Sequence, residues 1–546
     1  MKLIVIGSVA SGTSVAAKAR RNDENLEIKI FDKDRDISYS SCGLPYFIGE
    51  DYIERGNLTP RNSKWFKKRF NIDIFTEHEV LSIDKDNKKI MVKNLSTQEI
   101  FEETYDKLVL ATGSSPIELN IPSDSSIDIL KLKNVQDADK IREHINNSKL
   151  KKALIIGGGY IGLELCENLK KQGLDVVIVE KGNQLSPNLD IEVAQYVENY
   201  LIKNNIDIRK NTMVNEVREN IVYLDDDTNL TVDFIVSAVG VKANNSLGKA
   251  IDMEIGASGA YVVDKHLKTS INDIYAVGDC ALSYSKITGE KIYVPLGSTA
   301  NKMGRICGDH ITGGSLEFEG ILGTGIYKFF DLAVAQTGLT EKKALALEYD
   351  IEIIHNLKPN QTEYLNTSRE MLIKAIADKK TGRLLGAQIV GENGVDKRID
   401  VIATIINYSG KVEDLFQIDL AYAPPFSTTK DPIAYTGMIL TNSIYGKNPI
   451  ITYKELIKNR EQYTIIDVRS QEQYNNSHIE GAINIPLGNI REKYKELDKS
   501  LTYVVHCNKG VSGNAAQNLL RNLGFEKVYN LSGGFKESKI ESKIWK

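Results

Sequence analysis

The sequence contains no hydrophobic run that approaches the roughly 18–20 residues needed to span a bilayer. Its N-terminus, Met1 to Gly7, runs straight into a short apolar segment and lacks the longer apolar region and cleavage site of a secretion signal. The formal net charge of −4 leaves no basic excess for general nucleic-acid binding. These absences predict a protein with no membrane or nucleic-acid partner, and we expect it in the cytoplasm.

Cysteine is also scarce. The five cysteines stand far apart, at positions 42, 166, 280, 307 and 507, and no Cys-x-x-Cys pair exists to hold zinc or to form a short redox disulfide. A chain of 546 residues has room for three or four domains and does not need disulfide staples. We therefore predict no metal site, and each cysteine has to be judged by its own surroundings.

The sequence does contain a strand–turn–helix–strand pattern at its start. The apolar residues 3–6 lead into Gly7-Ser8-Val9-Ala10-Ser11-Gly12, a helix-like stretch follows, and the apolar segment 28–31 ends at Asp32. Such a βαβ unit places backbone N–H groups against a pyrophosphate, and its acidic residue accepts hydrogen bonds from ribose hydroxyls. Because Val9 replaces the middle glycine of the usual GxGxxG, a plain strand–turn–helix is the alternative for this segment.

The same pattern recurs in complete form later in the chain. Residues 153–156 lead into Gly157-Gly158-Gly159-Tyr160-Ile161-Gly162, and a second apolar segment, 175–179, ends at Glu180. An acidic residue at this position favours the free 2′-hydroxyl of NADH over the 2′-phosphate of NADPH. Neighbouring Lys181 leaves that choice open. Two such units predict two bound dinucleotides in an α/β fold.

Three further apolar segments end in small or acidic residues, at 108–113 (LVLATG), 234–240 (FIVSAVG) and 274–279 (IYAVGD). With the two βαβ units they resemble the two-dinucleotide-binding-domain flavoprotein reductases, over roughly residues 1–445. The resemblance implies FAD at the first unit and NADH or NADPH at the second. The residues implied for FAD are Gly7, Gly12, Asp32, Lys33, Thr112, Gly113, Gly278, Asp279 and Ala300, and those for the nicotinamide dinucleotide are Gly157, Gly159, Gly162 and Glu180.

Cys42 follows a polar run, Ser38 to Ser41, and precedes a Gly-Leu-Pro turn that opens a predicted helix. The helix dipole would favour the thiolate. A lone cysteine is commonly a buried apolar residue, but the polar run and the flavin domain favour a redox role. Ile37 and Phe47 occupy the positions five residues away, so Cys42 has no local partner for an internal disulfide of the glutathione reductase type. Its oxidised state is therefore a sulfenic acid, a persulfide or a mixed disulfide with a small thiol.

The string SYSSCGLPYFIG, together with PLGSTANKMGR (295–305), GVDKRIDVIATII (394–406) and LAYAPPF (420–426), resembles the coenzyme A-disulfide reductases. The resemblance implies that Cys42 attacks the substrate sulfur and that reduced FAD then regenerates its thiolate. The nearest relatives of that family are NADH oxidases and peroxidases, in which the lone cysteine forms a sulfenic acid, and they are the alternative.

The same resemblance implies the residues around the substrate. Tyr422 matches a tyrosine that reaches the active site from the partner subunit, which implies a homodimer; a buried tyrosine with a satisfied hydroxyl is the alternative. Tyr364 is a second candidate acid, although residues 359–369 depart from the usual loop. Coenzyme A carries phosphates, and its binding residues are implied at Arg20, Arg21, Ser38, Ser41, Asn301 and Arg305; ordinary solvated arginines are the alternative there. We expect Cys166, Cys280 and Cys307 to pack without a chemical role.

After a turn-prone linker, the C-terminal residues 450–546 alternate between strand and helix patterns. The strings IIDVRSQEQYNNSHIEGAINIPL, VVHCNKGVSG and NLSGGF resemble rhodanese sulfurtransferase domains. The resemblance implies a persulfide on Cys507 that backbone N–H groups stabilise, with Gly510 permitting the curl of the loop. Ser512 stands where the family usually has arginine, so we expect anionic donors such as thiosulfate to bind poorly. An inert rhodanese fold is the alternative.

The sequence thus predicts an α/β flavoprotein with an α+β dimerisation domain and a rhodanese domain. The expected boundaries are FAD-binding domain 1–116 and 251–320, connecting segment 117–148, NAD(P)H-binding domain 149–250, dimerisation domain 321–442, linker 443–449 and rhodanese domain 450–546. The functional hypothesis is an NAD(P)H oxidoreductase that reduces coenzyme A persulfide, polysulfide or coenzyme A disulfide and is coupled to a rhodanese persulfide carrier. A redox-sensing sulfur-carrier protein is the alternative outside enzymes. Three points stay open: whether the substrate is a disulfide or a persulfide, whether the electron donor is NADH or NADPH, and whether the rhodanese domain is active.

Overall fold

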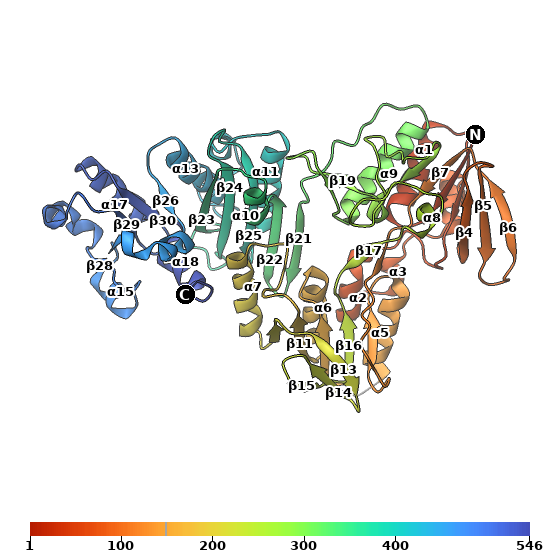
Figure 1. Cartoon of the computed structure of the whole chain (residues 1–546), viewed down its shortest axis with the longest axis horizontal. Helices are drawn as coiled ribbons and strands as arrows, with labels where there is room; N and C mark the ends of the chain where they lie inside the picture. Colours follow the sequence, from red (N-terminus) through yellow and green to blue (C-terminus); the bar gives the residue numbers. More distant parts are fainter. Residues whose placement is uncertain (148–149, 546) are drawn as a thin grey trace. The chain divides into compact units, whose positions relative to one another are not determined.

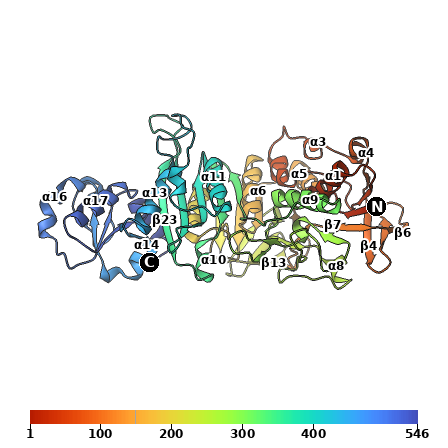
Figure 2. The same ribbon diagram turned by 90° about the horizontal axis from the view of Figure 1, so that it is seen from above.

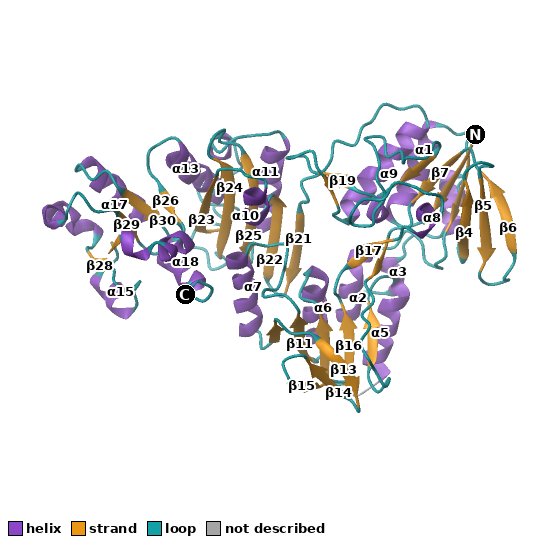
Figure 3. Ribbon diagram, in the orientation of Figure 1, coloured by secondary structure: helices purple, strands orange, loops and turns teal. Residues whose placement is uncertain are grey.

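The computed structural model describes residues 1–147 and 150–545. The chain forms two compact units, Met1–Asn183 with Ile206–Ile321, and Gln184–Asn205 with Leu322–Lys546. Helices and strands alternate through both units (Figure 3), as an α/β protein with an antiparallel dimerisation domain requires. In the described part of the chain, no helix has the length and apolar character of a membrane span. The predicted fold class is confirmed.

The first unit contains a parallel sheet with strand order β18-β7-β1-β2-β3. Its strands are β1 (Lys2–Ile6), β2 (Glu27–Phe31), β3 (Asp73–Phe75), β7 (Lys107–Leu110) and β18 (Ile274–Ala276). Helices α1 (Ala10–Asn22) and α9 (Gly297–Ile311) lie side by side in both views (Figures 1 and 2). Their backbones approach closely because Gly304 has no side chain; a Cβ there would lie 2.5 Å from the carbonyl oxygen of Ser11.

A second parallel sheet in the same unit has strand order β12-β11-β10-β16-β9. Its strands are β9 (Asp128–Lys131), β10 (Lys152–Ile156), β11 (Asp175–Glu180), β12 (Asp207–Lys210) and β16 (Phe234–Ser237). Helix α6 (Tyr160–Lys171) follows β10, and helix α5 (Val135–Asn147) follows β9. The two sheets are the two dinucleotide-binding folds that the sequence pattern predicts.

Smaller elements complete the first unit. Its short helices are η1 (Ser41–Gly43), α2 (Leu44–Gly49), α3 (Arg55–Leu58), α4 (Ser63–Phe70), α8 (Ser246–Lys249) and η2 (Gly278–Cys280). Its antiparallel strands are β4 (His78–Asp84), β5 (Lys89–Asn94), β6 (Ile100–Thr104), β8 (Ser114–Pro116), β13 (Val214–Arg218), β14 (Ile221–Leu224), β15 (Asn229–Thr231), β17 (Val241–Ala243), β19 (Ser283–Tyr284) and β20 (Lys291–Ile292). Helix α2 packs on α6 and α5, which brings the segment after Cys42 against the second dinucleotide-binding fold.

The second unit begins with an antiparallel sheet in the order β21-β22-β25-β24-β23. The strands are β21 (Gly325–Phe329), β22 (Leu332–Gly338), β23 (Ile351–Pro359), β24 (Glu370–Asp378) and β25 (Leu384–Gly391), and the helices are α10 (Glu341–Ala346), α11 (Val395–Asn407), α12 (Asp414–Gln417) and α13 (Pro432–Ile444). Helix α7 (Ile191–Lys203) belongs to this unit, although we expected residues 149–250 to form one NAD(P)H-binding domain. Its apolar face is buried against β25 and the last helix of the chain.

The rest of the second unit is a parallel sheet in the order β26-β30-β29-β27-β28. The strands are β26 (Ile450–Ile451), β27 (Thr464–Asp467), β28 (Ile483–Asn484), β29 (Tyr503–His506) and β30 (Val528–Leu531), and the helices are α14 (Tyr453–Lys458), η3 (Arg460–Gln462), α15 (Gln471–Asn476), η4 (Leu487–Asn489), α16 (Ile490–Lys493), η5 (Tyr494–Glu496), α17 (Val511–Asn522) and α18 (Gly534–Glu541). Because α13 extends to Ile444, the connection to β26 begins later than the predicted linker start at Ser443.

The two sheets of the second unit meet at the edge strand β23. The backbone N–H of His355 on this strand donates to Oγ of Ser532 at 2.7 Å. Since β23 pairs with β24 on its other side only, this hydrogen bond from the C-terminal part of the chain uses a backbone donor on an edge that would otherwise be free.

Charged side chains are buried at the same contact. The ammonium group of Lys374, which is fully buried, lies 2.9 Å from Asp190 and 2.7 Å from Glu341, and it also pairs with Glu192. Nε2 of His355 lies 3.3 Å from Glu192. A ligand-type atom of each of His355, Glu537 and Glu541 lies within 4.8 Å of the others. We call the seven residues Asp190, Glu192, Glu341, His355, Lys374, Glu537 and Glu541 the buried charge cluster.

Candidate active site

The two predicted dinucleotide turns have the same backbone geometry. Gly7 has a φ of +106° and Gly157 a φ of +108°, a conformation that residues with a side chain rarely adopt. A Cβ on Gly7 would lie 2.2 Å from the carbonyl oxygen of Ala111, and one on Gly157 would lie 2.6 Å from that of Ala238. Gly12 and Gly162 lie in the first turns of the following helices, where a Cβ would lie 1.9 Å from the carbonyl oxygen of Gly7 and 2.2 Å from that of Gly157. Both turns thus end a buried strand and open a helix N-terminus.

Asp32 lies at the end of β2, beside the first turn. Its Oδ2 accepts hydrogen bonds from the backbone N–H of Ser8 at 2.7 Å and from the hydroxyl of Ser8 at 2.5 Å. Burial raises the pKa of Asp32, and the hydrogen bonds from Ser8 oppose this. Lys33 is exposed next to it. The carboxylate is therefore held at the mouth of the turn, where a ribose would reach it.

Asp279 and Gly113 face the same region from other elements. Oδ2 of Asp279 accepts a hydrogen bond of 2.9 Å from the hydroxyl of Ser114 and lies 3.8 Å from Nζ of Lys133. Gly113 has a φ of +66°, and no atom lies within 4 Å of the place where a Cβ would stand. Thr112 donates to the carbonyl of Asn244 at 2.9 Å. The open space and the placed carboxylates fit a dinucleotide with an attached ring system, such as FAD.

Gly278 and Ala300 lie at the end of this region. Gly278 has a φ of +78°, and a Cβ on it would lie 3.5 Å from that of Ala300, which is 5 % exposed on α9. The tighter contact at Gly278 is with Ser11, whose Oγ would lie 2.5 Å from a Cβ there, so glycine is needed at this position for both its φ and its space.

Glu180 occupies the matching place in the second fold. Its Oε2 accepts from the backbone N–H of Gly158 at 2.8 Å, and its Oε1 accepts from that of Gly182 at 2.7 Å. No atom lies within 4 Å of the place where a Cβ on Gly159 would stand. A fixed carboxylate here repels a 2′-phosphate and accepts hydrogen bonds from free ribose hydroxyls.

Cys42 lies in the turn η1 and is exposed, whereas the other four cysteines are buried; all five are free thiols. Cys280 donates to the carbonyls of Leu110 and Val277 at 3.3 Å, and burial raises the pKa of Cys166 to about 12. Only Cys42 combines exposure with a position between the two dinucleotide folds of the first unit, so it is the candidate nucleophile.

The surroundings of Cys42 raise the pKa of its thiol. Cys42 is exposed as a residue, but protein atoms surround part of its sulfur, and this desolvation is the largest cause that raises the pKa of the thiol. The charge of Glu164 raises the pKa further, and the hydrogen bond from Ser41 opposes both. The following helix α2 begins at Leu44, two residues after Cys42, and is six residues long. The expectation that its N-terminus favours the thiolate stays a prediction.

Glu164 on α6 is a site residue that the sequence reasoning missed. Oε1 of Glu164 accepts a hydrogen bond of 3.2 Å from the hydroxyl of Tyr46. Burial raises the pKa of Glu164 to about 7. Tyr160, one turn earlier, has its pKa raised to about 12 by burial and then by the charges of Cys42 and Asp279. The only sequence signal for Glu164 is its position two residues after the last glycine of the GxGxxG.

The residues implied for coenzyme A divide into two groups. Ser38 and Ser41 lie in the segment just before Cys42. Asn301 and Arg305 lie one turn apart on the exposed side of α9, where Oδ1 of Asn301 accepts a hydrogen bond from the hydroxyl of Ser14 at 2.7 Å. Arg21 is exposed at the end of α1, above the ring of Phe70. These positions stay predictions.

Arg20 is different, and its predicted role needs correction. It is 3 % exposed, and its guanidinium donates to five backbone carbonyls, those of Phe70, Asp23, Glu24, Leu26 and Asn71. Because its N–H donors are used by carbonyls inside the protein, Arg20 stabilises the first fold. We therefore remove Arg20 from the predicted substrate-binding residues.

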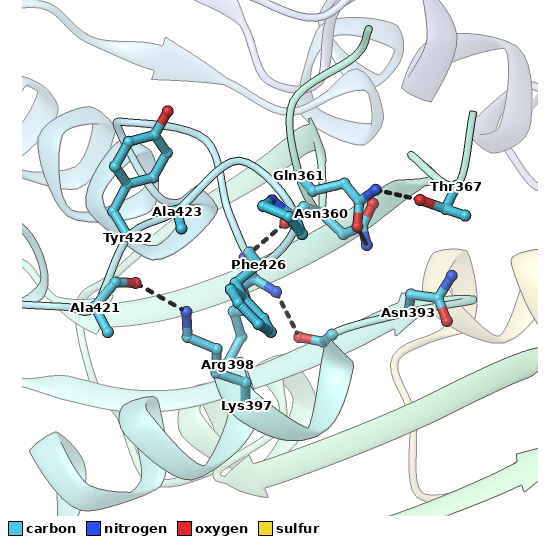
Figure 4. Close-up of a pocket in the computed structure, with 12 residues that line it drawn as sticks. Asn360, Gln361, Thr367, Asn393, Lys397, Arg398, Ala421, Tyr422, Ala423 and Phe426 are labelled. Carbon is cyan, nitrogen blue, oxygen red and sulfur yellow. Dashed lines mark hydrogen bonds between the residues drawn. The ribbon is translucent and has the colours of Figure 1, made fainter. Parts of the chain in front are cut away.

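Tyr422 lines a cavity of about 840 Å³ in the second unit. Figure 4 shows its hydroxyl pointing away from Arg398, whose guanidinium donates to the carbonyl of Asn360 at 2.9 Å. The side chain of Tyr422 is 47 % exposed, which contradicts the alternative of a buried tyrosine. Tyr364, in the loop between β23 and β24, is 75 % exposed. Both tyrosines are thus available at the surface of the second unit.

Cys507 directly follows strand β29. The backbone N–H of Gly510, whose φ is +102°, donates to Sγ of Cys507 at 3.2 Å. The loop therefore curls around the sulfur before α17 begins at Val511. This is the geometry in which backbone N–H groups can stabilise a negatively charged sulfur.

Comparison with known proteins agrees with these features. The family model "Pyridine nucleotide-disulphide oxidoreductase" matches residues 1–304, its dimerisation domain matches 325–432, and the rhodanese-like domain matches 452–541. A coenzyme A disulfide reductase of Staphylococcus haemolyticus is 33 % identical over 437 residues, which are 80 % of this chain and 98 % of that protein.

Two solved structures match nearly the whole chain. Reduced CoADR-RHD of Bacillus anthracis has a TM-score of 0.97 and 36 % identity, covering 100 % of this chain and 98 % of that one. An NAD-dependent persulfide reductase from A. fulgidus has a TM-score of 0.90 and 34 % identity, covering 98 % and 100 %. The chain therefore belongs to the pyridine nucleotide-disulphide oxidoreductase family, with a rhodanese-like domain after its dimerisation domain.

Proposed function

We propose that this protein is an FAD-dependent NAD(P)H oxidoreductase that cleaves the S–S bond of coenzyme A persulfide, polysulfide or coenzyme A disulfide at Cys42. The observation that carries the proposal is the exposed thiol of Cys42, which lies between two dinucleotide-binding folds without a cysteine partner. The relatives named as coenzyme A disulfide reductase and persulfide reductase share this architecture.

The proposed reaction begins at the sulfur of Cys42. Its thiolate attacks the substrate, the S–S bond breaks, and the leaving thiolate takes a proton. Bound FAD would pass two electrons from NAD(P)H to the mixed disulfide, which releases the second thiol and restores the Cys42 thiolate. With coenzyme A disulfide, one disulfide, one NAD(P)H and one proton are converted into two coenzyme A thiols and one NAD(P)⁺.

Glu164 supports this chemistry because its pKa of about 7 lets it hold a proton near Cys42 at neutral pH. When Glu164 is protonated, its charge no longer raises the pKa of Cys42, so the thiolate becomes easier to form. The fixed carboxylate of Glu180 supports NADH over NADPH.

We also propose a homodimer in which Tyr422 of one subunit contributes to the site of the other. Its exposure and the match of residues 325–432 to a dimerisation domain support this. Cys507 is proposed to carry a sulfane sulfur and pass it to coenzyme A. Five free cysteines suit a reducing compartment, so the cytoplasm is the proposed location.

The test follows NADH consumption with coenzyme A disulfide, coenzyme A persulfide, oxygen and hydrogen peroxide as acceptors. We expect turnover with the coenzyme A substrates, loss of turnover in Cys42→Ser with FAD reduction by NADH retained, and retained disulfide reduction in Cys507→Ser. Faster turnover with oxygen or peroxide would support an oxidase or peroxidase instead. A single turnover per subunit with every acceptor would support a sulfur carrier or sensor.

A further inference from the structure

The loop that holds Cys507 lacks a free cation of its own. Position 512 is serine, and the nearby Arg469 is committed to other partners: its NH2 donates to Asp467 at 2.6 Å and to the carbonyl of Ser477 at 2.7 Å. Within the described loop 507–513, Lys509 is the only cationic residue, and it pairs with Glu370. The one cation within the loop is therefore already engaged with a carboxylate, and no arginine of the loop faces an incoming anionic donor.

The dimerisation domain reaches this loop through the start of β24. Glu370, the first residue of that strand, pairs with Lys509 and, at 2.9 Å, with Lys536. The backbone N–H of Lys536 donates to the carbonyl of Asn508 at 3.0 Å, next to Cys507. One carboxylate thus pairs with both lysines, which leaves one net positive charge at this contact, and the same contact fixes the end of the sheet beside the loop.

Lys358 is brought to the same place by strand pairing. It is the last residue but one of β23, and its neighbour Pro359 lies opposite Glu370 in the sheet. Its Nζ lies 3.8 Å from the centre of the Tyr435 ring, and no carboxylate in the described part of the chain forms an ion pair with it. Burial and the charge of Lys509 lower the pKa of Lys358, and the charges of Cys507, Glu363 and Glu370 oppose this. Lys358 therefore has no ion-pair partner among the described residues, and it stands next to the strand position that faces Glu370, the partner of Lys509 in the Cys507 loop.

We propose that Lys358 completes the Cys507 site as the binding group for an anionic sulfane-sulfur donor, replacing from the dimerisation domain the charge that Ser512 does not supply. The inference rests on the proposed persulfide-carrier function of Cys507. It runs against the expectation, drawn from Ser512, that such donors bind poorly, because a cation would come from a different domain.

The step that Lys358 assists is a sulfur transfer without net oxidation. The Cys507 thiolate attacks the outer sulfur of a donor such as thiosulfate, the S–S bond of the donor breaks, and sulfite leaves with the electron pair. The persulfide on Cys507 then accepts the N–H of Gly510, while Lys358 holds the negative charge of the incoming and leaving groups.

The first experiment measures thiocyanate formation from thiosulfate and cyanide in the full-length holoenzyme. In Lys358→Gln we expect the KM for thiosulfate to rise about tenfold, since one charge-assisted contact is lost, with a smaller change in kcat. Adding Ser512→Arg to Lys358→Gln should restore the KM to near the wild-type value. Lys342→Gln, at an exposed position on α10, is the matched control and should change neither constant.

A second experiment does not need sulfur-transfer activity. In a Cys42→Ser background, the rate of Cys507 alkylation is compared for the anionic reagent iodoacetate and the neutral reagent iodoacetamide. Lys358→Gln should lower the ratio of the two rates several-fold, and Ser512→Arg should restore it. An unchanged ratio, or a lost activity that Ser512→Arg does not restore, would overturn the role of Lys358. A lowered ratio in a protein that transfers no sulfur would instead overturn the proposed carrier function of Cys507.

Discussion

The hydroxyl of Tyr46 donates a hydrogen bond of 3.2 Å to Oε1 of Glu164, whose charge acts on the thiol of Cys42. Because the pKa of Glu164 is about 7, its charge appears as the pH rises through neutrality, and it then raises the pKa of Cys42. The proton on the carboxyl group and the charge on the sulfur are therefore coupled across two segments of the first unit.

We expect Glu164→Gln to lower the pKa of Cys42, because the substitution removes the negative charge and keeps the shape. Thiol alkylation at pH 8 should become several-fold faster, while at pH 6, where Glu164 is largely protonated, the rates of wild type and variant should converge. Tyr46→Phe should act on Cys42 in the same sense but more weakly, because the lost hydrogen bond raises the pKa of Glu164 and keeps that carboxyl neutral to a higher pH. Parallel pH profiles for wild type and Glu164→Gln would contradict the coupling.

Arg305→Ala should raise the KM for coenzyme A disulfide about tenfold, because a phosphate loses one charged contact. The measurement compares this substrate with pantethine, which has the same disulfide arm without the nucleotide. The KM for pantethine and both kcat values should stay unchanged. Equal losses with both substrates would remove Arg305 from the nucleotide-binding set.

Arg20→Ala is expected to behave differently, because its guanidinium is used by five carbonyls inside the first fold. Its thermal midpoint should fall by several degrees, with the ratio of KM values for the two disulfides unchanged. A selective loss with coenzyme A disulfide would restore Arg20 to the substrate site.

The buried charge cluster predicts that the second unit loses stability as the pH rises. The hydrogen bond and charge of Glu192, against burial, raise the pKa of His355 to about 9, and burial raises that of Glu541 to about 8. Both groups bind protons more tightly in the folded state, so the stability they contribute is fully present below their ordinary pKa values, falls as the pH rises above those values, and is lost beyond about pH 8 for Glu541 and about pH 9 for His355. Calorimetric unfolding between pH 6 and 9.5 tests this.

Glu541→Gln should flatten that pH dependence, because the amide is neutral at every pH. Glu496→Gln, at an exposed position in the same domain, should leave the profile as in wild type. A Glu541→Gln profile that superimposes on wild type would show that this carboxyl does not titrate in the folded protein.

Lys374→Met should destabilise the second unit by about 3–5 kcal/mol, because it leaves carboxylates buried without their cation. Lys379→Met, in which an exposed lysine is lost at the end of the same sheet, should cost less than about 1 kcal/mol. Denaturant unfolding monitored at Trp545 reports on the domain that packs on the cluster. Equal losses of unfolding free energy in the two variants would show that Lys374 contributes no more to stability than an exposed lysine.

Local patterns in the sequence were enough to predict both dinucleotide turns. The apolar strand before Gly7 and Gly157 and the helix pattern after them predict these turns, because a tight turn between a strand and a helix needs glycine at that place. Asp32 and Glu180 follow from the spacing of the next strand. Exposure of Cys42 was predictable for the same reason, since its polar run and proline turn stand beside it in the chain.

Features that depend on distant contacts were not predictable. Glu164 meets Tyr46 across 118 positions, and nothing around either residue indicates the other. Arg20 and Arg21 are neighbours and share the same sequence context, yet the guanidinium of Arg20 is buried and that of Arg21 is exposed. The attachment of α7 to the second unit depends on the apolar surface it covers there, which the helix pattern alone does not identify.

The hydrogen bond from His355 to Ser532 has a consequence for how such a fusion can be divided. A protein cut between α13 and β26 would retain strand β23 with an uncovered edge. Lys374 and the carboxylates that pair with it would also become exposed to solvent. Exposed strand edges recruit other chains. Separating the modules therefore requires polar redesign of that edge, and recombination that simply deletes the C-terminal segment would yield an aggregating reductase.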